Sequence, residues 1–303
     1  MILPNVGAVF DVMPRLSVFA NYSRGLQVPS TDFLYNSFFF PLDTPQANPE
    51  PETTDNFDLG VRYRSGRLIA QVSGWYTIFE NRLAQAFDPD LDANVFRNLG
   101  TVHRYGIDAE LSAQVIPELL FRVYGSYLWS DIRGDVLAGE CSAQVSPLCP
   151  AGSLGTPIFA RTDGRRESGA PVYTFGGRLQ GSLGPVEIGV QAKRTGPRYV
   201  NDENLPITLC TVAFRNVRDC VGGTLFEVYP RRAPAYTTVD LDVRVPMGWA
   251  GLNDETFFQL NVTNLFDKFY VGGFGGGLLN TSVPFAQIGA PRAIIGTLVV
   301  GFR

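Results

Sequence analysis

Alternation of apolar and polar residues with a period of two is the feature that most limits what this sequence can fold into. In one clear case, Val239, Leu241 and Val243 alternate with Asp240 and Asp242. Because successive side chains of a β-strand point to opposite faces, such a segment has one apolar and one charged face. The alternation recurs along the chain, and helical periodicity is absent. The sequence therefore predicts an all-β fold.

The alternation predicts about eleven strands, several of them long. They are expected near residues 2–10, 15–25, 53–64, 67–81, 95–112, 118–132, 170–183, 186–198, 232–246, 254–270 and 289–303. Crossing a bilayer at a tilt takes roughly nine to eleven residues, more than the usual strand of a soluble sheet. No apolar run is long enough for a membrane-spanning helix.

The connections between these strands alternate between short and long. Short turns containing Gly or Pro are expected at 11–14, 65–66, 115–118, 184–185 and 246–253, and long segments at 26–52, 82–94, 133–169, 199–231 and 271–288. Since antiparallel strands reverse direction, all short turns emerge at one end of the sheet and all long loops at the other. Outer-membrane barrels show this asymmetry, with short periplasmic turns and long extracellular loops.

Alternation alone does not decide whether the apolar face contacts lipid or a protein core, and a soluble β-sandwich or propeller also alternates. Strand length, a charged opposite face and aromatic residues near strand ends favour a transmembrane antiparallel β-barrel. The aromatic groups expected at the membrane interface are Trp75, Tyr76 and Phe79; Tyr124, Tyr127 and Trp129; and Phe266, Phe269 and Tyr270. Eleven is an odd number, whereas single-chain bacterial barrels have even counts, so we expect part of a barrel of about 22 strands.

Composition and charge narrow the functional classes. A net charge of −4 gives no basic surface for nucleic acid, so that partner is not expected. The first ten residues lack the pattern of a secretory signal peptide, so an exported protein would need further residues upstream.

Four cysteines fall in two local pairs. Cys141 with Cys149, and Cys210 with Cys220, lie in Gly- and Pro-rich segments. This spacing predicts structural disulfides in an oxidising compartment, although four cysteines allow three pairings. No metal site and no cofactor are predicted. His103 is the single histidine, and no motif joins it to a nucleophile, so we do not expect an enzyme.

Three segments resemble conserved patterns of TonB-dependent outer-membrane receptors of the siderophore type. They are NPEPETTDNFDLGVRYRSG from Asn48, NLGTVHRYGIDAE from Asn98, and NVTNLFDKFY from Asn261, of which the last is the most specific. Their order and spacing also fit, and the resemblance spans almost the whole chain. It implies that residues 1–303 form the C-terminal part of such a barrel.

The resemblance implies active import across the outer membrane of a Gram-negative cell. In this family a plug inside the barrel binds the inner-membrane protein TonB, and the proton-motive force drives release of a scarce nutrient, often a ferric siderophore. A receptor for cobalamin or an oligosaccharide, and a passive porin-like barrel, are the alternatives. Lipid, lipopolysaccharide, TonB and a small-molecule iron chelate are the expected partners.

Cationic and aromatic residues of the long loops are the candidate ligand-binding residues. They are Arg161, Arg165 and Arg166; Arg194, Arg198 and Tyr199; Arg231 and Arg232; and Tyr35 and Phe38 with the adjacent Phe39 and Phe40. Guanidinium groups suit carboxylate or catecholate chelates because they donate planar, bidentate hydrogen bonds. The alternative is that these arginines pair with lipopolysaccharide phosphates or with nearby Asp163, Glu167, Asp202 and Glu203.

Overall fold

The structure is a computed structural model of the chain. It describes residues 2–28, 50–88, 93–140, 156–211, 223–253, 255–275 and 285–301. Within these ranges the secondary structure consists of strands and one short 3-10 helix, η2 (Gly248–Ala250). No helix among the described residues is long and apolar enough to span a membrane.

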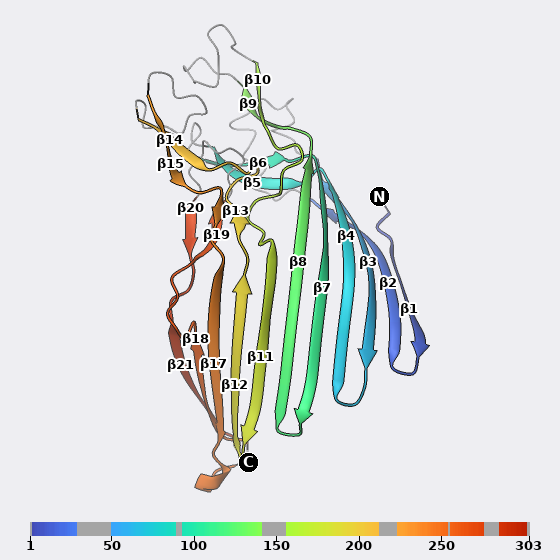
Figure 1. The fold of residues 1–303 in the computed structure, drawn as a ribbon, viewed down its shortest axis with the longest axis vertical. Helices are drawn as coiled ribbons and strands as arrows, with labels where there is room; N and C mark the ends of the chain where they lie inside the picture. Colours follow the sequence, from blue (N-terminus) through green and yellow to red (C-terminus); the bar gives the residue numbers. More distant parts are fainter. Residues whose placement is uncertain are drawn as a thin grey trace.

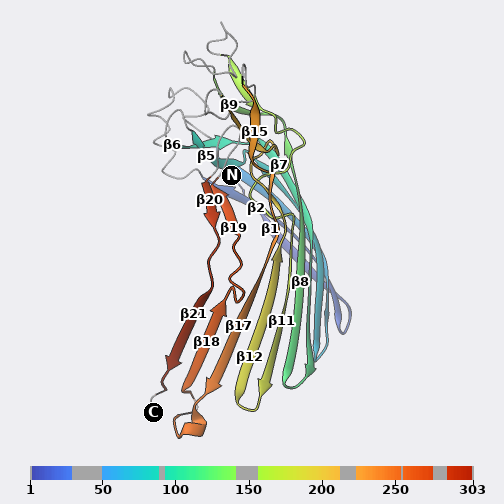
Figure 2. The ribbon, with the colours of Figure 1, turned by 60° about the vertical axis from the view of Figure 1, so that its left-hand side comes forward.

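Eleven strands form one antiparallel sheet in which each strand pairs with the next main strand along the chain. They are β1 (Asn5–Met13), β2 (Leu16–Gln27), β3 (Glu52–Arg64), β4 (Leu68–Glu80), β7 (Thr101–Ile116), β8 (Leu119–Arg133), β11 (Tyr173–Leu183), β12 (Val186–Thr195), β17 (Tyr236–Pro246), β18 (Phe257–Thr263) and β21 (Ala293–Val299). The sheet is strongly curved, with β1 and β21 at its two edges (Figures 1 and 2).

The two ends of the sheet differ as predicted. Four tight turns and the η2 segment join the main strands at the lower end in Figure 1, and every longer connection leaves from the upper end. Among the described residues, four of these connections carry two-stranded sheets: β5 (Leu83–Asp88) with β6 (Ala93–Asn98), β9 (Val136–Glu140) with β10 (Pro157–Ala160), β13 (Arg198–Tyr199) with β16 (Arg232–Ala233), β14 (Ile207–Cys210) with β15 (Leu225–Tyr229), and β19 (Val271–Gly275) with β20 (Phe285–Ile288).

The eleven main strands match the predicted eleven in order; their lower ends differ from the predicted bounds by a few residues, and the larger differences lie at their upper ends. The strand expected at 95–112 is divided into β6 and β7, because Gly100 has a φ of +70° and turns the chain. The strands expected at 186–198 and 232–246 likewise divide into β12 with β13 and β16 with β17.

The prediction of a strand at 254–270 was wrong for the second half of this range, because β18 ends at Thr263. Asn264 and Asp267 have φ values of 49° and 51°, which Asn and Asp tolerate better than most residues. The Asn264 side chain accepts a hydrogen bond from Lys268 N at 2.8 Å and donates to Lys268 O at 3.0 Å and Ala290 O at 3.1 Å. The segment from Asn261 is therefore half strand and half turn.

The described residues do not enclose a conventional core between two layers. Their one buried apolar cluster lies at the upper end and consists of Leu99, Val102, Ile132, Val136 and Ala160, with Phe79 packed against it. Many apolar residues of the strands remain exposed, such as Leu59 at 62% and Ile107 at 59%. The apolar stripe of the strands is thus an external surface, as a barrel in lipid requires.

Candidate functional site

The cross-strand register separates the sheet into two chemically different faces. In one row across three strands, Gln191 of β12 lies opposite Arg178 of β11 and Asp240 of β17. The neighbouring row places Val190 opposite Leu179 and Leu241. We call the face that carries Gln191, Arg178 and Asp240 the polar face, and the opposite face, which carries Val190, Leu179 and Leu241, the apolar face.

The apolar face carries a belt of aromatic rings near its upper end. Tyr22 contacts Phe57, Tyr76 contacts Tyr105, and Tyr105 stacks on Trp129 with ring centroids 6.4 Å apart. Such a belt is typical of the membrane interface. His103 lies on this same face, with Nδ1 2.6 Å from the hydroxyl oxygen of Tyr76.

Three of the predicted interface aromatics lie on the other face. Trp75, Phe79 and Tyr124 pair across strands with Gly106, Val102 and Glu110, and all belong to the polar face. The prediction for them was wrong because adjacent residues of a strand, such as Trp75 and Tyr76, cannot share a face.

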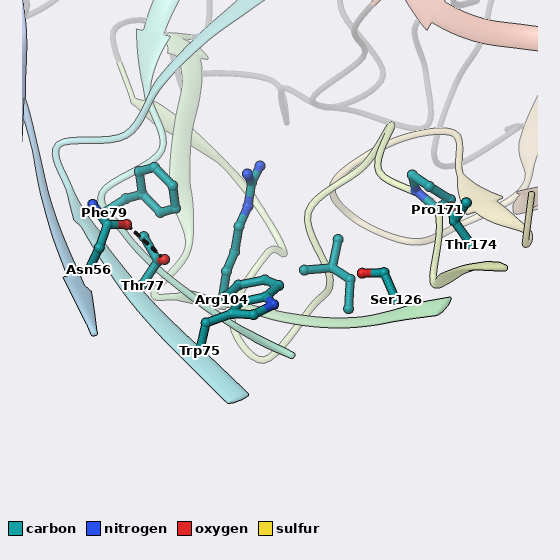
Figure 3. Close-up of a pocket in the computed structure, with 9 residues that line it drawn as sticks. Asn56, Trp75, Thr77, Phe79, Arg104, Ser126, Pro171 and Thr174 are labelled. Carbon is teal, nitrogen blue, oxygen red and sulfur yellow. Dashed lines mark hydrogen bonds between the residues drawn. The ribbon is translucent and has the colours of Figure 1, made fainter. Parts of the chain in front are cut away.

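A pocket of about 270 Å³ lies on the polar face near the long-loop end (Figure 3). Nine residues line it: Asn56, Trp75, Thr77, Phe79, Arg104, Ser126, Leu128, Pro171 and Thr174. They come from β3, β4, β7, β8 and β11 and from the segment that precedes β11. Figure 3 shows their side chains gathered on the inner side of the curved wall. The hydroxyl of Thr77 donates a hydrogen bond to Asn56 Oδ1 at 2.9 Å.

The indole of Trp75 lies along the wall because its neighbour across the strands is glycine. A Cβ atom added at Gly106 would stand 2.6 Å from Cζ2 and 2.8 Å from Cε2 of Trp75. Distances this short are repulsive for carbon atoms. The missing side chain of Gly106 therefore allows the Trp75 ring to lie flat and form part of the pocket.

An ion cluster with two buried glutamates adjoins the pocket through Arg104. Glu167, 9% exposed, accepts hydrogen bonds from Arg82 Nε at 3.1 Å and Arg104 Nε at 2.6 Å. Arg82 also donates to both carboxylate oxygens of Glu52, at 2.8 and 3.0 Å. Burial by itself lowers the pKa of Arg82, but Glu167 and Glu52 outweigh it and the pKa stands above its ordinary value. The charges of the two arginines and the two glutamates therefore cancel. The guanidinium carbons of Arg82 and Arg104 also lie 4.7 and 5.0 Å from the ring centroid of Phe79.

Side chains of residues 201–204 form hydrogen bonds with the backbone of the segment that carries Glu167. Asn204 accepts a hydrogen bond from Arg166 N at 2.9 Å and donates to Arg166 O at 2.7 Å. Asp202 accepts from Ser168 N at 2.7 Å. Burial raises the pKa of Asp202 to about 6, and the nearby Glu167 carboxylate adds to the rise, while Ser168 and Arg82 oppose it.

The predicted arginines at 161–166 do not enter the pocket. Arg161 and Arg165 are exposed, and Arg166 lies with its guanidinium carbon 3.9 Å from the centroid of Trp129, on the apolar face. The backbone N–H of Arg161 donates to Glu203 at 3.0 Å. A role for these three residues in ligand binding stays a prediction.

Of the other predicted ligand residues, Arg194 lies on the apolar face, whereas Arg198 and Tyr199 bind other loop residues. Arg194 donates to Thr237 Oγ1 at 3.1 Å on the apolar face. Arg198 is 3% exposed and donates to the carbonyl oxygens of Val271 and Gly272, so it ties β13 to β19. Tyr199 accepts a hydrogen bond from Arg232.

Several predicted positions lie outside the described residues. They are Tyr35, Phe38, Phe39 and Phe40, together with Cys141, Cys149 and Cys220. Cys210 is disulfide-bonded. The pairing of the four cysteines stays a prediction.

Sequence reasoning missed the pocket residues Trp75 and Arg104 and the role of Glu167. The alternation already places Trp75 on the face of Gln71 and Ser73, so its orientation could have been found from the sequence. The contact between Glu167 and Arg104 spans 63 residues and follows from loop folding, for which the sequence carries no local signal.

Comparisons with known proteins identify the family. A family model described as "TonB dependent receptor-like, beta-barrel" matches residues 1–265. The ferrioxamine receptor of Yersinia enterocolitica is 22% identical over 95% of this chain, and the metal-pseudopaline receptor of Pseudomonas aeruginosa is 25% identical over 88%. The chain spans 31% and 30% of the lengths of these two relatives.

Solved structures share the fold. The ferric citrate transporter, in its unliganded form, matches with a TM-score of 0.63 and 15% identity over 97% of this chain and 37% of its own. The ferric yersiniabactin uptake receptor of Yersinia pestis matches with a TM-score of 0.61 and 17% identity over 97% of this chain and 36% of its own. Together with the family match over most of its length, these likenesses show that the chain belongs to the β-barrel family of the TonB-dependent receptors.

Proposed function

We propose that this chain is the C-terminal part of the barrel of an outer-membrane, TonB-dependent uptake receptor whose cargo is an iron complex such as a ferric siderophore. In this proposal the apolar face contacts lipid, the polar face lines the lumen, and the long connections face the outside of the cell. TonB would bind a plug that lies outside these residues.

The pocket on the polar face is the observation that carries this proposal. It lies at the long-loop end of the wall, where a ligand arriving from outside would first meet the lumen. A largely preformed concavity with aromatic and hydrogen-bonding groups is typical of small-molecule sites. Relatives whose names describe receptors for ferrioxamine and for metal-pseudopaline support a metal-chelate cargo.

Growth on iron chelates tests the proposal. A strain that lacks the full-length receptor is compared with the same strain carrying it, each with and without TonB, on a panel of ferric chelates as the only iron source. We expect at least one chelate to support growth only when both the receptor and TonB are present.

Two outcomes would overturn this function. Equal growth of the receptor-deficient strain on every chelate would remove the iron-complex assignment. Uptake that needs the receptor but not TonB would instead favour a passive porin-like barrel.

A further inference from the structure

The pocket contains a guanidinium group whose charge is already compensated. Arg104 is the one cation among the nine lining residues, and Glu167 binds both its Nε and its Nη2 atoms. The second arginine of the cluster, Arg82, is shared between Glu167 and Glu52. An anionic ligand would have to compete with two buried carboxylates for these arginines, and desolvated partners of this kind are costly to separate.

Two acidic residues flank the pocket on the same face. Asp58 lies directly opposite Trp75 in the register, and Asp108 lies directly opposite Ser126. Neither carboxylate forms an ion pair with another residue in the part of the chain that the structure describes. Directly opposite residues have Cβ atoms about 5 Å apart, so both negative charges act on anything bound against Trp75 or Ser126.

The remaining lining groups suit a ligand that donates or accepts neutral hydrogen bonds. Ser126 and Thr174 line the pocket, and their hydroxyls make no hydrogen bond to another described residue. Trp75 is half-buried, lines the pocket, and has its indole ring over Gly106. Hydroxyl groups beside an aromatic ring can orient a bound ligand through hydrogen bonds, and the ligand needs no charge for this.

We propose, on the basis of the function proposed above, that this pocket selects a part of the ligand that carries no negative charge and stacks on Trp75 while hydrogen-bonding to Ser126 and Thr174. The compensated arginines and the flanking Asp58 and Asp108 exclude carboxylate and catecholate groups from this part of the wall. The specificity therefore arises as much from repulsion of anions as from attraction of neutral groups.

Calorimetric titration of the purified full-length receptor in detergent tests this selection. The two probes are a ferric trihydroxamate chelate, whose iron centre is neutral, and a ferric tricatecholate chelate, which is anionic. We expect the neutral chelate to bind more tightly, and we expect Trp75→Ala to weaken its binding about tenfold, which corresponds to the loss of one aromatic contact.

Matched variants separate the pocket from the rest of the receptor. Trp249→Ala removes a tryptophan that is 73% exposed in the turn at the opposite end of the sheet, so neutral-chelate binding should not change. Asp108→Asn should strengthen binding of the anionic chelate several-fold and leave the neutral one unaffected. If Trp75→Ala does not fold, Trp75→Phe and Ser126→Ala provide milder changes that should each weaken neutral-chelate binding.

The outcomes distinguish this inference from the proposed function. Tighter binding of the anionic chelate, or loss of binding that is equal in Trp75→Ala and Trp249→Ala, would overturn the pocket's selectivity while leaving an iron-complex receptor intact. Binding of neither chelate, together with growth that never depends on the receptor, would overturn both.

Discussion

Aromatic rings that lie over glycines recur along the polar face. Trp75 of β4 covers Gly106 of β7, Phe19 of β2 covers Gly60 of β3, and the Tyr124 hydroxyl lies 2.7 Å from the place of a Cβ atom at Gly176 of β11. Each ring occupies the space that a side chain on the next strand would need. The first of these contacts bears on the pocket, because Trp75 is one of its lining residues.

A substitution that adds one methyl group at Gly106 tests the contact between Trp75 and Gly106. Gly106→Ala should lower the free energy of unfolding by about 1–3 kcal/mol, since the new carbon meets both the indole and the carbonyl oxygen of Tyr127. The measurement is the denaturant midpoint of the full-length receptor in detergent micelles. Gly74→Ala is the matched control, because its Cβ would meet only Gly106 O at 3.9 Å. Equal midpoints for the two variants would contradict the steric explanation.

Hydrogen bonds join two of the connecting segments at the upper end of the sheet. Residues 161–172 reach the polar face through Glu167, and residues 198–204 reach the same segment through Asp202 and Asn204. The link runs from Arg82, which follows β4, and Arg104 of β7, through the segment that carries Glu167, to the residues after β13. These connections are therefore parts of an ordered rim and not independent loops.

The Asp202 carboxyl makes this rim sensitive to pH. Its pKa in the folded state, about 6, lies above the ordinary value of 3.8, so the folded form binds the proton more tightly. The resulting stabilisation is complete below pH 3.8 and is lost as the pH rises through about 6. Amides of residues 161–172 should exchange hydrogen more slowly at pH 5 than at pH 7.5, after correction for the intrinsic rates.

Asp202→Asn is the control for this pH dependence. The amide keeps an oxygen to accept the hydrogen bond from Ser168 N but does not titrate. The corrected exchange of residues 161–172 should then be equal at both pH values. A difference that persists in this variant would assign the effect to another group.

The strands were predictable from the sequence, whereas the rim was not. Period-two alternation and the Gly184-Pro185 turn depend on neighbouring residues, so they can be read locally. The end of β18 also had a local signal, since Asn264 and Asp267 are residues that tolerate positive φ. The ion cluster joins Glu52, Arg82 and Glu167 through folded loops, and nothing in their local sequence indicates that they meet.

At the scale of the whole molecule, the two faces of the curved sheet should respond differently to charge. Val190 on the apolar face and Gln191 on the polar face are adjacent in the middle of β12. Val190→Lys should cost about 2–4 kcal/mol in a bilayer because the charge faces hydrocarbon, while Gln191→Lys should be tolerated. The fraction of full-length receptor that folds into lipid vesicles, measured by its heat-sensitive migration in a denaturing gel, reports the difference. Equal folding of the two variants would contradict the assignment of the apolar face to lipid.

The ion pair between Arg178 and Asp242 extends across an intervening strand. Its two nitrogen–oxygen contacts are 2.7 and 2.9 Å, and a Cβ atom at Gly189 of β12 would collide with Arg178 and stand 2.6 Å from the Asp242 carboxylate. A side chain at position 189 would have to push aside the ends of the Arg178 and Asp242 side chains and would therefore disturb the pair. We therefore expect changes at positions 178, 189 and 242 to be correlated among related chains, and such a correlation would report that β11, β12 and β17 are neighbours.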